Sequence, residues 1–195
     1  MTPTYPIKTA RLRLRPFIET DFDDMFDFHS RPEVVEFLYW NVRSRAETEE
    51  LLKKRITTTT LSKEGDALAL AVVLPDQNKL VGDVTLVWRS EEHQQAEIGF
   101  VFNPDHHGQG YATEASEAML ALGFREFSFH RIYGRCDARN VGSYKLMERL
   151  GMRREAHFIQ NEIFKGEWGD EFVYAMLQKE WAERVRDKRS STNKI

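Results

Sequence analysis

Residues 105–124, DHHGQGYATEASEAMLALGF, place two glycines directly before a long helical pattern. Glycine held in regular structure costs roughly 0.5–1 kcal/mol of extra backbone entropy. A turn needs only one such residue, so the pair Gly108 and Gly110 indicates that a ligand approaches the backbone closely there. The N–H groups that open a helix are unpaired and carry about half a positive charge, which favours a phosphate. This segment therefore predicts a phosphate-binding turn between a strand and a helix.

Two well-known phosphate-binding patterns do not fit this turn. A P-loop requires Gly-Lys-Ser/Thr, whereas Gly110 is followed by Tyr111 and Ala112. A dinucleotide fingerprint requires a third glycine, which is missing here. The spacing Gly110-Tyr111-Ala112 fits the Gly-x-Gly/Ala of an acyl-CoA pyrophosphate loop, and an ordinary helix-opening turn is the alternative.

The rest of the chain mixes strand and helix patterns. Alternating apolar residues predict strands at 10–15, 66–75, 80–89, 96–104, 131–138, 155–164 and 170–177. Cap residues and apolar spacing predict helices at 21–30, 45–63 and 140–151, the second with Ser44 as its cap and Glu47 three residues on, and a long helix directly after the glycine pair. The order predicts an α/β fold with a mixed, mostly antiparallel sheet of six to seven strands and helices on both faces. We expect one domain over residues 1–181 and a charged, frayed tail over 182–195.

Composition excludes several classes of protein. A net charge of −3 over 195 residues argues against nucleic acid or an anionic membrane as the partner. The first residues lack the apolar core of a signal peptide and no long apolar run occurs, so we expect a cytoplasmic protein. The single cysteine, Cys136, allows no internal disulfide and is expected in the core. His106 and His107 are adjacent, a poor spacing for shared metal ligation, so we expect no metal.

Three separated segments resemble one enzyme family. FNPDHHGQGYATEA is similar to the acetyl-CoA signature of the GNAT N-acetyltransferases, Gln/Arg-x-x-Gly-x-Gly/Ala. With NVGSYKLMERLGM and GEWGDEFVYAML, the chain resembles the ribosomal-protein (Rim-type) branch. The resemblance spans residues 9–178 and implies the GNAT fold with acetyl-CoA as co-substrate. His107 stands at the Gln/Arg position, so that contact is expected to be weaker or pH-dependent.

The resemblance also implies which residues bind the cofactor. The backbone of the strand at Phe100, Val101 and Phe102 would hydrogen-bond the pantetheine arm as an added strand, with one N–H for the oxyanion. The loop and helix start would hold the pyrophosphate through His107, Gly108, Gln109, Gly110, Tyr111, Ala112 and Thr113. Asn140 would contact the cofactor arm.

Acetyl transfer needs a base for the amine and a proton for the departing thiolate. The resemblance puts a general-base carboxylate at about the position of Glu97, for which a solvated strand glutamate is the alternative. In the Rim-type branch the serine at Ser143 is the candidate acid, beside Asn140, although both also fit a plain capped helix. Many other GNAT enzymes carry a tyrosine near Met147, and methionine cannot donate a proton, so Ser143 or a water that it holds takes this role.

The sequence thus predicts an N-acetyltransferase that works by direct attack in a ternary complex. The Rim-type resemblance points to a protein or peptide α-amine, whose pKa of about 7.7–8.0, against about 10.4 for lysine, requires only a moderate base. Transfer to a small amine, such as a polyamine, amino sugar or amino acid, is the first alternative, favoured by acidic residues at 21–27 and 91–93. A non-catalytic acyl-CoA-binding or interaction module is the second. We expect a monomer or homodimer, with His157 and Asp170 as the next candidates for the base.

Overall fold

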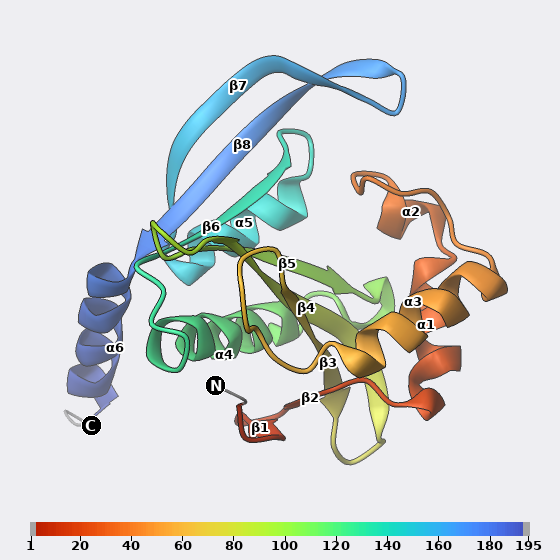
Figure 1. Ribbon diagram of the computed structural model, residues 1–195, viewed down its shortest axis with the longest axis horizontal. Helices are drawn as coiled ribbons and strands as arrows, with labels where there is room; N and C mark the ends of the chain where they lie inside the picture. Colours follow the sequence, from red (N-terminus) through yellow and green to blue (C-terminus); the bar gives the residue numbers. More distant parts are fainter. Residues whose placement is uncertain (1–2, 193–195) are drawn as a thin grey trace.

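An eight-stranded sheet runs through the computed structural model, which describes residues 3–192 (Figure 1). The order across the sheet is β1-β2-β3-β4-β5-β6-β8-β7. The strands are β1 (Ile7–Lys8), β2 (Arg13–Arg15), β3 (Ala67–Leu74), β4 (Lys79–Ser90), β5 (Gln95–Phe102), β6 (Arg131–Asp137), β7 (Arg153–Phe164) and β8 (Glu167–Leu177). The helices are α1 (Phe22–His29), α2 (Pro32–Val35), α3 (Arg45–Thr57), α4 (Tyr111–Arg125), α5 (Val141–Leu150) and α6 (Gln178–Thr192), with 3-10 turns η1 (Glu19–Asp21) and η2 (Pro104–His106).

The predicted fold class is confirmed, with one strand more than expected. All neighbouring strands in the described residues are antiparallel except β5 and β6. The extra strand is β1, whose two residues pair with β2 through Ile7 and Leu14. Such a short strand leaves no alternation in the sequence from which it could be recognised.

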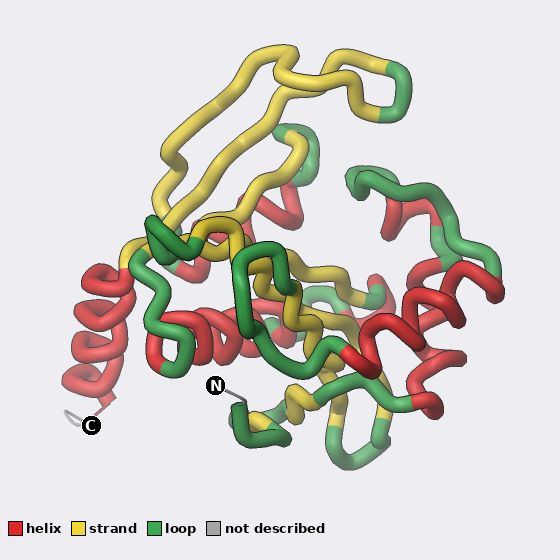
Figure 2. Tube along the Cα trace, viewed as in Figure 1, coloured by secondary structure: helices red, strands yellow, loops and turns green. Residues whose placement is uncertain are grey.

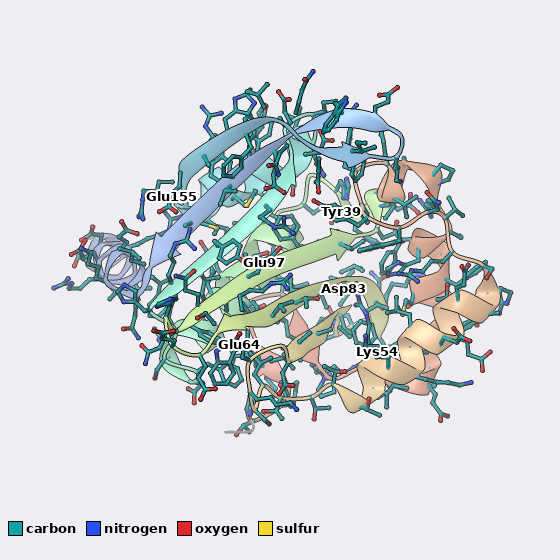
Figure 3. The ribbon with its side chains drawn as sticks, turned by 45° about the horizontal axis from the view of Figure 1, so that its top comes forward. Tyr39, Lys54, Glu64, Asp83, Glu97 and Glu155 are labelled. Carbon is teal, nitrogen blue, oxygen red and sulfur yellow. The ribbon has the colours of Figure 1, made fainter. Side chains whose placement is uncertain are left out.

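Helices cover both faces of the sheet, as predicted (Figure 1). One core lies between the sheet and helices α4 and α5 and includes Ile98, Met119 and Leu146. A second core lies under α1 and α3 and includes Met25 and Leu52. Helices α1 and α3 cover only part of their face, and the β5–β6–β8 part of that face is left open (Figure 3).

The parallel strands β5 and β6 are paired over a short stretch only. Their register joins Gln95 to Arg131, Ala96 to Ile132 and Glu97 to Tyr133, and no pairing follows (Figure 2). We call the point after Glu97, where the two strands diverge, the fork. Beyond the fork, the edge of β5 that faces β6 has no strand partner over residues 98–102. An extended ligand can bind the free backbone N–H and C=O groups of this edge as an added strand.

Helix α3 begins where predicted and ends earlier. The Ser44 side chain accepts from the Glu47 backbone N–H and the Glu47 carboxylate accepts from the Ser44 N–H, so both halves of the capping box form. The helix stops at Thr57 instead of Lys63, because the threonine run at 57–60 has low helix propensity.

The expected frayed tail differs from the structure, since α6 continues through Thr192. Trp181 packs on Phe124 with 5.7 Å between ring centroids. Glu180 forms an ion pair with Arg153, and Arg184 donates to the backbone carbonyl of Arg149 at 2.7 Å. These contacts hold a segment whose polar composition alone suggests solvation; residues 193–195 lie outside the described part. Within residues 3–192, no helix is long and apolar enough to cross a membrane.

Candidate functional site

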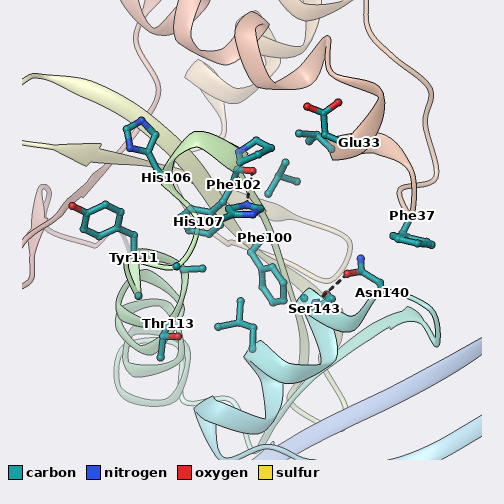
Figure 4. Close-up of a pocket in the computed structure, with 18 of the residues that line it drawn as sticks. Glu33, Phe37, Phe100, Phe102, His106, His107, Tyr111, Thr113, Asn140 and Ser143 are labelled. Carbon is teal, nitrogen blue, oxygen red and sulfur yellow. Dashed lines mark hydrogen bonds between the residues drawn. The ribbon is translucent and has the colours of Figure 1, made fainter.

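A pocket of about 720 Å³ opens between the start of α4, the start of α5, β5 and α2 (Figure 4). Its wall contains most of the predicted cofactor residues, namely Phe100, Val101, Phe102, His107, Gly108, Gly110, Tyr111, Ala112, Thr113 and Asn140. Ser143 also lines it, whereas Gln109 and Glu97 do not. The structure therefore brings the glycine turn, the unpaired edge of β5 and the start of α5 to one cavity.

The glycine turn has the backbone geometry of an anion site. Gly108 and Gly110 have φ values of 75° and 80°, in the left-handed region that favours glycine. Gly110 is the N-cap of α4, and no side chain caps this helix. The first helical hydrogen bond runs from the Glu114 N–H to the Gly110 carbonyl at 3.1 Å. The N–H groups of the first turn before Glu114 are thus available to a ligand.

Two arginines beside the turn were not anticipated from the sequence. Arg11 donates to the Gln109 carbonyl at 2.8 Å and forms an ion pair with Glu114 at 2.7 Å, which fixes the turn from outside the pocket. Arg149, near the end of α5, lines the pocket, and its Nε lies 3.4 Å from Thr113 Oγ1. No local pattern marks Arg149, because Thr113 is 36 residues away.

His107 lies in the pocket wall and faces the backbone of β5 (Figure 4). Its Nε2 is 3.3 Å from the Phe102 carbonyl oxygen. Because a carbonyl only accepts, this contact requires a hydrogen on Nε2. His106 lines the same pocket, but residues 3–192 contain no group of three His, Cys, Asp or Glu side chains placed to hold a metal ion.

Asn140 and Ser143 form the start of α5 (Figure 4). The Asn140 Oδ1 accepts from the Ser143 backbone N–H at 3.0 Å, which leaves the Ser143 hydroxyl free of the cap. Cys136 is the neighbouring thiol, and burial raises its pKa to about 12. Met147 is buried with its Sδ against Gly134, so it offers no polar group to the pocket.

Glu97 lies at the fork, on the open sheet face (Figure 3). Its carboxylate accepts from Arg89 Nε at 2.8 Å and from Arg135 Nε at 3.3 Å. Glu97 shares its face of β5 with Val101, which belongs to the core under α1 and α3. Its role as the base stays a prediction.

Other polar residues on the open face come from distant segments. Arg135 NH1 donates to Glu171 Oε2 at 3.1 Å, and the Tyr39 hydroxyl donates to Glu162 Oε1 at 2.5 Å. Glu171 is only 4 % exposed; burial raises its pKa, against the attraction of Arg135. Up to 123 residues separate these partners in the chain, so no local sequence pattern marks them.

His157 and Asp170 pair with each other instead of lining the pocket. His157 Nε2 lies 3.2 Å from Asp170 Oδ2, and the His157 ring stacks edge-on against Phe172 at 4.7 Å. Phe172 in turn contacts Tyr144 of α5. The pair thus lies on the α5 side of the β7–β8 hairpin, opposite to Glu171.

Comparisons with known proteins agree on one family. A family model described as an acetyltransferase (GNAT) domain matches residues 11–153. The chain is 36% identical over 176 residues to the uncharacterized N-acetyltransferase YnaD of Bacillus subtilis (strain 168), covering 90% of this chain and 98% of YnaD. The crystal structure of a GNAT-family acetyltransferase from Bacillus anthracis is similar with a TM-score of 0.81 and 35% identity, over 90% of this chain and 100% of that one.

Relatives with a named substrate are more distant. The spermidine N-acetyltransferase of Vibrio cholerae, in complex with CoA and spermine, shares the fold with a TM-score of 0.75 at 23% identity, over 89% of this chain and 99% of that one. The [ribosomal protein uS5]-alanine N-acetyltransferase of Escherichia coli (strain K12) is 26% identical over 121 residues, covering 61% of this chain and 62% of that protein. The acceptors of the two proteins belong to different chemical classes.

Proposed function

The chain belongs to the GNAT acetyltransferase family, and from this premise we propose that it transfers the acetyl group of acetyl-CoA to a peptide or protein N-terminal α-amine. The observation that carries the proposal is the single pocket in which the glycine turn, the unpaired edge of β5 and Ser143 meet. The family resemblance to the Rim-type branch and the ribosomal-protein relative support the acceptor class.

The residues of the pocket fit acetyl-CoA. The first-turn N–H groups of α4 and the guanidinium of Arg149 supply positive charge for the phosphates. The unpaired β5 edge at 98–102 matches the amide groups of a pantetheine arm. A CoA complex of the Vibrio cholerae relative supports the same cofactor. Acetyl-CoA supplies an acetyl thioester, which is an activated acyl group.

The transfer consists of direct attack within a ternary complex. The amine nitrogen attacks the thioester carbon, the C–S bond breaks, and the amine loses one proton while the thiolate gains one. A backbone N–H of β5 beyond the fork stabilises the oxyanion. The Ser143 hydroxyl donates a proton to the thiolate sulfur and regains one from solvent, and Glu97 receives the amine proton, directly or through one water, and releases it to solvent.

Replacing Gly110 with valine should raise the Kd for acetyl-CoA by about tenfold or more, roughly 1.4 kcal/mol. A side chain is strained at φ 80°, and its Cβ would lie 3.4 Å from Arg11 NH2, so the turn that presents the first-turn N–H groups has to shift. Calorimetry with acetyl-CoA measures the change. The matched control is Gly65→Val, because Gly65 also has a positive φ, of 91°, with open space around it and no place in the pocket wall. Equal affinity in the two variants contradicts the loop assignment.

The proposed acceptor is tested by acetyl-CoA turnover, measured as free-thiol release, with peptides, polyamines and amino sugars. We expect the highest kcat/KM with peptide α-amines. Highest activity with spermidine would support the second candidate, for which the Vibrio cholerae relative is the precedent. Acetyl-CoA binding without thiol release from any acceptor would indicate a non-catalytic module.

Glu97→Gln should lower kcat at neutral pH, because glutamine keeps the shape of the side chain and removes the proton acceptor. The loss should become smaller as pH approaches the pKa of the acceptor, where the amine is already neutral. A peptide α-amine should recover at lower pH than a lysine-type amine, given their difference of about 2.5 units. The pH profile of kcat with both acceptors measures this. A profile identical to that of the unchanged protein would mean that Glu97 has only a structural role beside Arg89 and Arg135.

A further inference from the structure

Five side chains form a continuous polar chain across the open sheet face. Arg135 donates to Glu97 at 3.3 Å and to Glu171 at 3.1 Å. The Tyr39 hydroxyl lies 3.5 Å from Glu171 Oε2 and donates to Glu162 Oε1 at 2.5 Å. We call these five residues the acceptor-face chain; Figure 3 labels Glu97 and Tyr39. The acceptor-face chain leads from the fork, where acetyl transfer is proposed, to the β7–β8 hairpin.

Tyr39 belongs to a segment that contacts the hairpin. The Lys165 ammonium donates to the Val35 carbonyl at 2.6 Å, and the Tyr39 ring packs edge-on against Phe164 at 5.6 Å. The same segment contributes Glu33, Val34, Phe37 and Leu38 to the pocket wall. Tyr39 and Glu162 therefore lie where the pocket-lining segment meets the hairpin, at the end of the polar chain away from the fork.

The charges along this route do not cancel. The acceptor-face chain and the neighbouring Arg89 carry three carboxylates and two guanidiniums: Glu97, Glu162, Glu171, Arg89 and Arg135. Both guanidiniums contact Glu97, and one also contacts Glu171. Among the described residues, the only hydrogen-bond partner of the Glu162 carboxylate is the neutral Tyr39 hydroxyl. Glu162 is thus the one carboxylate of the group without a cation.

The surroundings of Glu162 combine apolar surface with further positive charge. Phe158 is 46 % exposed and pairs across the hairpin with Glu171, so both project from the same face. Lys165 lies in the hairpin turn with its ammonium on the Val35 carbonyl, whereas the Arg139 guanidinium over the Phe37 ring is paired with Asp137 and Glu167. The Lys165 ammonium repels a second positive charge on an acceptor, whereas the exposed Phe158 ring favours an apolar group beside the amine.

We propose that Glu162 binds the ammonium of the acceptor, which displaces the Tyr39 hydroxyl, and thereby selects amines with one positive charge next to an apolar group. The inference rests on the proposed function and specifies its acceptor class as an N-terminal α-amine followed by neutral, apolar side chains. Glu162 holds the charged form of the amine before its proton leaves, so it determines specificity and is distinct from the base.

Acceptor binding is measured by calorimetry in the presence of CoA, which cannot be turned over. The probes are alanyl-phenylalanyl-alanine amide, alanyl-lysyl-lysine amide and spermidine. The first should bind tightest. Glu162→Gln should weaken it by about tenfold or more, the effect of removing a charge-assisted hydrogen bond, while the Kd for CoA is unchanged. Glu162→Asp, which keeps the charge, should retain more of the affinity.

Two further variants separate recognition from a structural effect. Glu167→Gln removes an exposed carboxylate from the same hairpin and should leave the peptide Kd unchanged. Tyr39→Phe removes the internal competitor for Glu162, so the peptide should bind at least as tightly as to the unchanged protein. Weaker binding to Tyr39→Phe would overturn the displacement.

The inference is also overturned if spermidine binds more tightly than alanyl-phenylalanyl-alanine amide. It is overturned as well if Glu162→Gln and Glu167→Gln change the Kd of that peptide by the same factor. Its failure is distinguishable from failure of the proposed function. Binding that depends on Glu162 without thiol release from acetyl-CoA contradicts only the enzyme activity. Normal thiol release from acetyl-CoA with peptides, at a KM that does not depend on Glu162, contradicts only the inference.

Discussion

Ser143→Ala should lower kcat for acetyl transfer by about 10²- to 10⁴-fold, the range of general-acid catalysis, with little change in the Kd for acetyl-CoA. The Asn140 side chain bonds the Ser143 backbone N–H, not its hydroxyl, so alanine keeps the cap and removes only the proton donor. Cys136 is the neighbouring protic group, and burial raises its pKa to about 12. It does not line the pocket, whereas Ser143 does, so Cys136 is not placed to replace Ser143 as the acid.

The leaving group provides the decisive comparison. An acyl donor with a more acidic thiol needs less protonation, so the loss in Ser143→Ala should be smaller with that donor. Steady-state thiol release with both donors measures the ratio, and Ser62→Ala, an exposed serine outside the pocket, is the control. Equal losses with the two donors would remove Ser143 from the chemistry.

Asp83→Ala should lower the free energy of unfolding by about 3–5 kcal/mol, the cost of breaking a buried ion pair on one side. Asp83 is 1 % exposed under α1 and α3. Its Oδ2 lies 2.8 Å from Arg55 NH1 and 3.8 Å from His29 Nε2, and His29 is fully buried. Without the carboxylate, the Arg55 guanidinium keeps its burial and loses its counter-ion.

Chemical denaturation measures this loss, and Asp76→Ala, in the exposed turn between β3 and β4, should stay within about 0.5 kcal/mol of the unchanged protein. The contribution of Asp83 to the free energy of unfolding also depends on pH. Burial alone would raise the pKa of Asp83, but Arg55 and His29 outweigh it and hold that pKa below its usual value. The stabilisation is therefore complete above the unfolded pKa of about 3.9 and is lost as pH falls below it. Equal acid sensitivity in Asp83→Ala and the unchanged protein would contradict this assignment.

The sequence by itself determined the features that depend on near neighbours. The Ser44–Glu47 capping box and the Asn140 cap join residues three apart, and the conformation of Gly108 and Gly110 depends on their lack of a side chain. Such interactions are encoded in a few consecutive letters, as is the alternation that marks a strand. The mixed sheet with helices on both faces was predictable from the order of these elements.

Only the tertiary structure decided which distant residues meet on the open sheet face and in the pocket. Tyr39 meets Glu162 across 123 residues, Arg135 meets Glu97 across 38, and Arg149 meets Thr113 across 36. These contacts depend on sheet order, on the short β5–β6 pairing, on the reach of a long hairpin and on the packing of α5 against α4, none of which leaves a periodic signal in the sequence. Helix α6 also depends on distant contacts. Its polar sequence predicts a solvated segment, but Trp181 packs on Phe124 and Arg184 donates to the Arg149 carbonyl, and these contacts stabilise the helix. Local hydrogen bonds can be predicted from adjacent residues, whereas charges on an open sheet face pair with whatever the fold brings next to them.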